Sequence, residues 1–126
     1  MPFPLLLHRF LNFGRRSELL AIDYLRSLGY RVVTSSYRTK DGEVDIIGWD
    51  GEILAFIEVK ARQSSDPPQD AVGYRKQQRV IRAAQAYLAK HHLRDACYRF
   101  DILTVSANPG CKPEFRLFRD AFHMYN

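Results

Sequence analysis

Residues 42–62 read GEVDIIGWDGEILAFIEVKAR, and the architecture can be built outward from this stretch. The apolar run within Ile53–Ala61 is typical of a buried strand. The segment Val44–Trp49 before it also has strand character, and the Asp50-Gly51 pair between the two is a strong signal for a tight turn. The stretch therefore predicts a β-hairpin whose second strand is largely apolar.

Three charged residues stand at the end of this hairpin. Because side chains alternate along a strand, Glu58 and Lys60 fall on the same face, roughly 6.6 Å apart along the chain. If the strands pair around the turn, the numbers of partner residues add up to about 101 to 103. Asp45 then lies opposite Lys60 or within a couple of positions of Glu58. Two carboxylates and an amine are thus expected to converge at one end of an apolar sheet.

The rest of the chain adds two helices and three strands. Hydrophobic periodicity predicts helices over 15–28 and 74–91, and β-branched or apolar patterns predict strands over 30–37, 98–105 and 115–118. A polar, proline-containing loop, Gln63–Asp70, precedes the second helix. The order α-β-β-β-α-β-β contains no internal repeat. It predicts one α/β or α+β domain, a sheet with helices packed on it.

Composition and charge fit a single cytoplasmic domain. The 126 residues are 46% hydrophobic, and 19 basic against 14 acidic residues give a net charge of +5, which favours a polyanionic partner. Cys97 and Cys111 lack metal-binding spacing and are expected to be free thiols in a reducing cytosol. Residues 1–13 have neither the features of a signal peptide nor the length of a membrane span. They are interpreted as an N-terminal arm before a domain over 14–126.

The charged residues of the hairpin admit two interpretations. On spacing alone they can form an ion cluster at the rim of the sheet, in which Lys60 neutralises Asp45 or Glu58. The cost of desolvating such charges argues against a purely structural purpose, since apolar replacements often stabilise at least as well. The other interpretation is chemical. Hard oxygen ligands suit Mg²⁺, and an amine can position or deprotonate a water beside a phosphodiester.

Several motifs together resemble a known family. Asp45 followed by Glu58-Val59-Lys60 on a hairpin looks like the PD-(D/E)xK nuclease motif. The wider pattern is similar to the bacterial YraN-like family, and it consists of Gly14, Glu18, Gly29-Tyr30, Tyr37-Arg38, GEVDII at 42–47, FIEVKAR at 56–62, Lys76-Gln77, RFD at 99–101 and Ala121-Phe122. One departure is Ser36, where the family usually has asparagine. The resemblance covers nearly the whole chain beyond Gly14. It implies a restriction-endonuclease-like fold, a mixed β-sheet flanked by helices, similar to archaeal Holliday-junction resolvases.

The resemblance also implies roles for five residues. Asp45 and Glu58 would be ligands of Mg²⁺, with Mn²⁺ as a substitute, and the main-chain carbonyl of Val59 would be a third ligand. Lys60 would orient the attacking water or stabilise charge on the phosphate. Glu18 matches an acidic position that completes the site in the resolvase-type branch. Its place at the head of an otherwise apolar helix stripe supports this role independently, although a solvated position beyond the core is the alternative.

Basic and polar residues around the hairpin are candidates for nucleic-acid contacts. The set is Arg38, Lys40, Arg62, Lys76 and Gln77, with simple solvation as the alternative for the last two. Weaker candidates are Glu43, for a second metal, and an arginine stripe at 75, 79 and 82, which is more often a solvated helix face. Asp101 is expected to pair with a neighbouring arginine.

Two classes of function follow. One is a Mg²⁺-dependent endonuclease that hydrolyses phosphodiester bonds, with DNA favoured over RNA as its substrate and branched DNA among the candidates. The other is a nucleic-acid-binding module that keeps the nuclease fold without cutting. A protein-interaction scaffold would be favoured only if salt-dependent nucleic-acid binding were not found. Resolution of a four-way junction needs two sites, and hence a homodimer.

Overall fold

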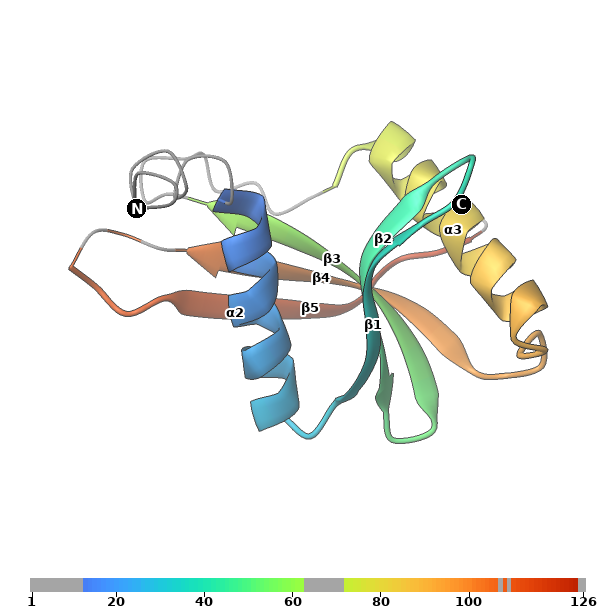
Figure 1. Ribbon diagram of the computed structural model, residues 1–126, viewed down its shortest axis with the longest axis horizontal. Coiled ribbons are helices and arrows are strands. Elements are labelled where there is room, and N and C mark those ends of the chain that lie inside the picture. Colours follow the sequence, from blue (N-terminus) through green and yellow to red (C-terminus); the bar gives the residue numbers. More distant parts are fainter. Residues whose placement is uncertain (1–12, 63–71, 107, 109, 125–126) are drawn as a thin grey trace, which may run out of the picture.

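The computed structural model in Figure 1 describes residues 13–62, 72–106, 108 and 110–124. The predicted loop Gln63–Asp70 lies outside the described residues. So does the predicted N-terminal arm, except for Phe13, at which the first described helix begins.

Two helices and five strands occur in the predicted order. They are α2 (Phe13–Ser27), β1 (Arg31–Arg38), β2 (Glu43–Asp50), β3 (Ile53–Arg62), α3 (Tyr74–Lys90), β4 (Tyr98–Ser106) and β5 (Glu114–Phe122). Most ends differ from the sequence prediction by one or two residues. The exception is β5, which continues to Phe122. Residues 119–121 are all exposed and lack the alternation that marks a strand, so only pairing with β4 defines this extension.

The five strands form one mixed sheet in the order β1-β2-β3-β4-β5. β3 and β4 are parallel and are joined by a crossover through α3, whereas the other neighbours are antiparallel. In the hairpin Ile46 pairs with Ile57, so the next step of the register places Asp45 beside Glu58. The predicted convergence of these two residues is confirmed.

The helices cover opposite faces of the strongly twisted sheet (Figure 1). Each face has its own apolar core, because side chains of the central strands alternate between the two sides. Under α2 the buried residues are Ala21, Ile22, Leu25, Tyr30, Ile46, Ala55, Ile57, Leu103 and Val105. Under α3 they include Val44, Leu54, Phe56, Val80, Ala84, Tyr87, Phe100 and Phe122. No helix in the described ranges is long and apolar enough to cross a membrane.

Gly42 brings the β1–β2 turn against α3. A Cβ atom on Gly42 would lie 1.9 Å from the main-chain oxygen of Arg79, which is far inside van der Waals contact. The absence of a side chain therefore allows the two backbones to approach. As a consequence, Glu43 at the start of β2 faces the basic side chains of α3.

Candidate functional site

Glu58 is a buried carboxylate at the end of the β2–β3 hairpin. It is 2% exposed, and neither of its oxygens accepts a hydrogen bond from a residue that the structure describes. Burial and the neighbouring Asp45 carboxylate raise the pKa of Glu58 to about 10, and Lys76 acts in the opposite direction. Buried polar groups in native folds are normally satisfied. An orphaned carboxylate therefore suggests a ligand from outside the chain.

Asp45 lies next to Glu58, where the β2–β3 register reaches its last pair, Ile46 and Ile57. At the next step the Oδ2 atom of Asp45 accepts a hydrogen bond from the backbone N–H of Val59, at 2.9 Å. The N–H and C=O groups of one strand residue point to the same side. The Val59 carbonyl is therefore directed to the side of β3 on which Asp45 lies.

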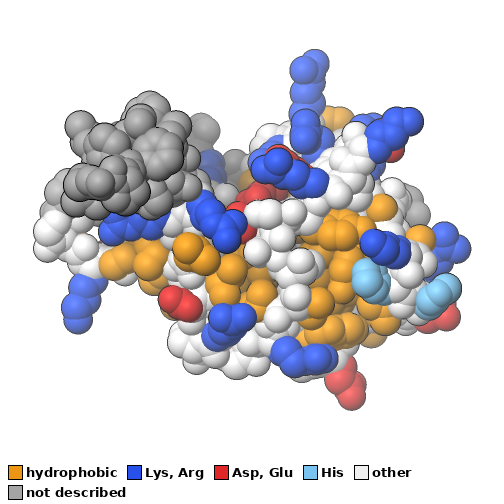
Figure 2. Space-filling model, in the orientation of Figure 1, with side chains coloured by type: hydrophobic (Ala, Val, Ile, Leu, Met, Phe, Trp, Pro, Cys, Tyr) orange, Lys and Arg blue, Asp and Glu red, His pale blue; other side chains and the backbone are white. Residues whose placement is uncertain are grey.

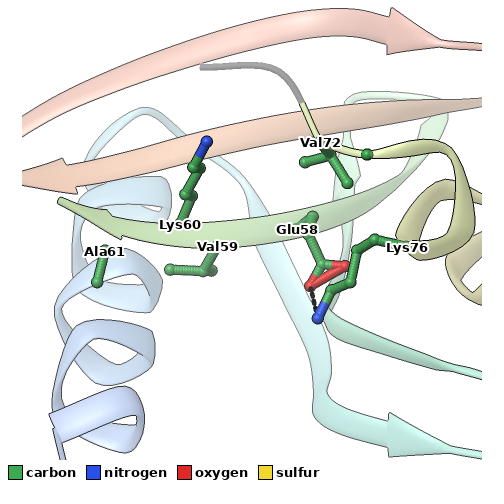
Figure 3. A pocket seen from close by; sticks show the side chains of 7 residues that line it. Glu58, Val59, Lys60, Ala61, Val72 and Lys76 are labelled. Carbon is green, nitrogen blue, oxygen red and sulfur yellow. Dashed lines mark ion pairs between the residues drawn. The ribbon is translucent and has the colours of Figure 1, made fainter. Parts of the chain in front are cut away.

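A pocket of about 360 Å³ opens beside these groups and is lined by Glu58, Val59, Lys60, Ala61, Val72, Gly73 and Lys76. In Figure 3 Glu58 and Lys60 project from β3 into the region of this pocket, and the amine of Lys60 points away from Glu58. The Lys60 amine thus borders a different part of the pocket from the carboxylate.

The cation that contacts Glu58 comes from α3. Lys76 Nζ lies 3.6 Å from Glu58 Oε1 and 3.9 Å from Glu43 Oε1, and Figure 3 shows its side chain reaching across to Glu58. Sequence reasoning placed Lys76 among the phosphate contacts and did not connect it with Glu58. The contact depends on the crossover from β3 through α3 to β4, for which no local sequence signal exists.

Two further basic side chains lie beside Glu43. Arg38 lies 3.4 Å and Arg79 3.7 Å from Glu43. Figure 2 shows Lys and Arg side chains over the upper part of this face, with a small acidic group between them. Lys60 and Lys76 line the pocket itself, so positive charge lies where a polyanion would approach.

Glu18 is held from the neighbouring strand. The hydroxyl of Ser36 donates a hydrogen bond of 2.8 Å to Glu18 Oε1. Ser35 pairs with Ile46 and Tyr37 with Val44, so in the same register Ser36 faces Asp45. Ser36 has a φ of 51°, a left-handed conformation that asparagine adopts more readily than serine. This backbone geometry explains why asparagine suits the position, and Ser36 is a site neighbour that the sequence alone did not reveal.

The donor atoms at Asp45 and Glu58 fit a hard divalent cation. Two carboxylates and the Val59 carbonyl are oxygen ligands of the kind that Mg²⁺ prefers, and Mg²⁺ usually keeps several waters. Within the described residues no three His, Cys, Asp or Glu side chains form a group that could hold a metal ion. Glu18 therefore does not complete a three-carboxylate set in this conformation, and its role as a ligand stays a prediction.

The nucleic-acid candidates occupy different environments. Arg38 is 77% exposed on its side chain, Lys40 is exposed in the β1–β2 turn, and Arg62 is partly buried at the end of β3. Gln77 instead donates a hydrogen bond from Nε2 to the Val72 carbonyl, at 2.8 Å. Its side chain thus ties the first turn of α3 to the preceding segment, whereas phosphate contacts by the other three stay predictions.

A second buried charge cluster lies near the opposite end of β2. Asp101 is fully buried and accepts hydrogen bonds from Arg99 Nε at 2.9 and 3.1 Å. Arg99 also donates to Asp50 at 2.7 Å and to the Tyr30 hydroxyl at 2.6 Å. The predicted pairing of Asp101 with an arginine is confirmed. Because its members bond to one another, this cluster joins the connection between α2 and β1 to β2 and β4.

The comparison with known proteins supports the family resemblance that the sequence motifs indicated. Residues 17–105 match the model of Uncharacterised protein family UPF0102. A UPF0102 protein of Geotalea uraniireducens is 38% identical over 115 residues, covering 90% of this chain and 91% of the relative. A UPF0102 protein of Syntrophus aciditrophicus is 41% identical over 117 residues, covering 90% and 91%. A third, from Alkaliphilus metalliredigens, is 44% identical over 96 residues, covering 75% and 84%. The chain belongs to the UPF0102 family.

Proposed function

We propose that this protein is a Mg²⁺-dependent endonuclease of the PD-(D/E)xK type that hydrolyses phosphodiester bonds in DNA. The observation that carries the proposal is the buried Glu58 carboxylate, which lacks a hydrogen-bond partner among the described residues and stands beside Asp45. A structural ion cluster would give such oxygens hydrogen bonds, because a buried carboxylate without them is costly, and the Lys76 contact at 3.6 Å is too long to be one. A site shaped for a metal leaves them available.

The residues divide the chemical work. Asp45, Glu58 and the Val59 carbonyl would hold the ion, and a bound Mg²⁺ would supply Lewis-acid stabilisation of charge on a phosphoryl oxygen. Lys60, on the same face of β3, would orient the attacking water or stabilise charge on the phosphate. A positioned proton-transfer group contributes typically ~10²–10⁴-fold in rate. The Ser36–Glu18 pair would fix the position of a further acceptor near Asp45.

The substrate would be bound through its phosphates. Arg38, Lys40 and Arg62 would contact the phosphates, and the net charge of +5 favours a polyanion. Phosphate contacts carry little sequence information, so recognition would depend on the shape of the nucleic acid, including branches. Cleavage of a four-way junction would need a homodimer. Two exposed free cysteines fit action in the cytoplasm.

A second candidate is a nucleic-acid-binding module without cleavage. It is favoured by the lack, among the described residues, of three side chains that could hold a metal together. Binding should then weaken steeply with salt, as in the enzyme, but no substrate should be cut.

A cleavage screen tests the proposal and separates the candidates. Linear, flapped and four-way substrates of DNA and RNA are incubated with Mg²⁺ or Mn²⁺, and Asp45→Asn is run beside the wild type. The expected result is metal-dependent cleavage by the wild type only. Salt-dependent binding without cleavage of any substrate supports the module, and salt-insensitive binding or none counts against both.

A further inference from the structure

The Lys76 ammonium contacts one oxygen of the buried Glu58 carboxylate. Its Nζ atom lies 3.6 Å from Glu58 Oε1, closer than to Glu43 Oε1 at 3.9 Å. Its side chain is 43% exposed and starts from the first turn of α3. A long, flexible side chain that reaches a buried oxygen from the solvent side can withdraw without disturbing the core.

A metal ion and this ammonium would compete for the same oxygen. Mg²⁺ binds carboxylate oxygens at about 2.0–2.1 Å, whereas the ammonium stands only 3.6 Å from Glu58 Oε1. A metal ion on that oxygen would lie within about 6 Å of the ammonium, and two cations at such a distance repel, the more so where the site is partly shielded from water. Figure 3 shows no other labelled side chain reaching Glu58. The geometry therefore makes Lys76 the group that must move.

We propose that Lys76 is an exchangeable cation that contacts Glu58 in the site without metal and is displaced from it when the metal ion binds. This inference rests on the proposed metal site and adds a residue that sets its affinity. If Lys76 leaves Glu58 accessible for a tenth of the time, the apparent Kd for metal is weakened by about tenfold. Lys76 is a positioning residue in this scheme, and the α3 helix carries it.

Arg79 provides a matched control on the same helix. It also lies beside Glu43, at 3.7 Å, whereas within the described residues it forms no ion pair with Glu58. Its side chain is 54% exposed, close to the 43% of Lys76. Arg79→Met thus removes one positive charge from the same surface, and Lys76→Met removes the same charge together with the contact to Glu58. A general electrostatic effect would change metal binding similarly in both.

The test is a calorimetric titration with Mg²⁺ and Mn²⁺ on full-length wild type and on the Lys76→Met, Lys76→Arg and Arg79→Met variants. Lys76→Met should bind metal about tenfold more tightly than the wild type, and Arg79→Met within about twofold. Lys76→Arg keeps a competing cation and should stay near the wild type. Equal changes in Lys76→Met and Arg79→Met, or no change in either, overturn the inference while the metal site stands.

A second readout follows the amine itself. In protein with ¹³C-methylated lysines, the Lys76 signal, assigned by its absence in Lys76→Arg, should shift on titration with Mg²⁺ and should move in the same direction in metal-free Glu58→Gln. A Lys76 signal that does not shift at saturating Mg²⁺ overturns the inference that the metal ion displaces Lys76. If neither wild type nor Lys76→Met binds metal, the proposed metal site itself fails, and the inference fails with it.

Discussion

Asp45 Oδ2 accepts a hydrogen bond from the backbone N–H of Val59, at 2.9 Å, and thereby joins two strands at the point where their ladder reaches its last pair. The same contact holds the Asp45 carboxylate beside the buried Glu58. One side chain thus serves the sheet, as a backbone acceptor, and the pocket, as a charged oxygen. The two duties can be separated by substitution.

Asp45→Asn should separate them, because an asparagine oxygen can still accept from Val59 while the negative charge is lost. Mg²⁺ affinity should fall, and metal-free stability should stay level or rise because the Asp45 charge no longer opposes the ionisation of Glu58. Asp45→Ala is the contrasting variant. It leaves the Val59 N–H unpaired and should cost about 1–3 kcal/mol. Calorimetry and denaturant unfolding measure both effects. Intact metal binding in a markedly destabilised Asp45→Asn would favour the ion-cluster interpretation.

Glu58 should make metal-free stability depend on pH. Its pKa rises from 4.5 to about 10 in the folded chain, so the native state retains a proton that the unfolded state releases. The free energy of unfolding should therefore decrease as pH rises from 4.5 towards 10. In Glu58→Gln this dependence should disappear.

The measurement is denaturant unfolding across this range with a chelator present. Glu43→Gln, which removes the other carboxylate partner of Lys76, is the control and should keep the wild-type slope. A Glu58→Gln profile parallel to that of the wild type would contradict the assigned cause. Metal affinity should rise with pH, since binding requires the ionised carboxylate.

Lys60 should separate catalysis from binding. Lys60→Ala should remove most cleavage, a loss of about 10²–10⁴-fold, while metal binding stays nearly intact. Lys60→Arg preserves charge with a poorer base of different reach. Substantial activity in Lys60→Arg would indicate that charge is sufficient, whereas a loss like that of alanine indicates handling of the water. Initial cleavage rates provide the measurement. If the wild type cuts nothing and both variants bind nucleic acid like the wild type, Lys60 is a structural counter-ion.

Gly42→Ala should unfold or strongly destabilise the chain. The added Cβ would meet the main-chain oxygen of Arg79 at 1.9 Å, and a backbone atom cannot yield as a flexible side chain does. The expected cost is about 3 kcal/mol or more. Gly73→Ala is the control, since nothing lies within 4 Å of its added Cβ; alanine is a poorer N-cap residue than glycine, so its cost should be about 1 kcal/mol or less. The denaturation midpoints of the two variants measure this difference. Similar midpoints would refute the close approach of the Gly42 backbone to the Arg79 backbone.

Ser36→Asn should stabilise the protein. The φ of 51° at this residue strains serine more than asparagine, and relief should contribute about 1 kcal/mol. Ser36→Ala keeps the strain and removes the hydrogen bond to Glu18, so it should be less stable than the wild type. Thermal unfolding of the three proteins gives the order. An asparagine variant no more stable than the wild type would show that the conformation costs little.

The hairpin illustrates how far local sequence reaches. Turn residues at Asp50-Gly51 and the period-two alternation fix which residues pair, because both act over a few residues and leave one register that buries the apolar face. Asp45 and Glu58 therefore lie side by side, as predicted. The order of the elements is also the predicted one. The end of β5 was missed, because residues 119–121 are all exposed and only pairing with β4 extends the strand.

The partners of the site residues required the tertiary structure. Lys76 reaches Glu58 because a parallel crossover carries α3 back over the sheet, and Gly42 sets how closely that helix approaches. The contact of Glu18 with Ser36 likewise depends on how α2 packs on β1. Long-range contacts of this kind follow from the packing of whole elements, and no short stretch of sequence encodes them. Residue types and register came from the sequence, whereas the fold buried Glu58 where no described residue gives it a hydrogen bond.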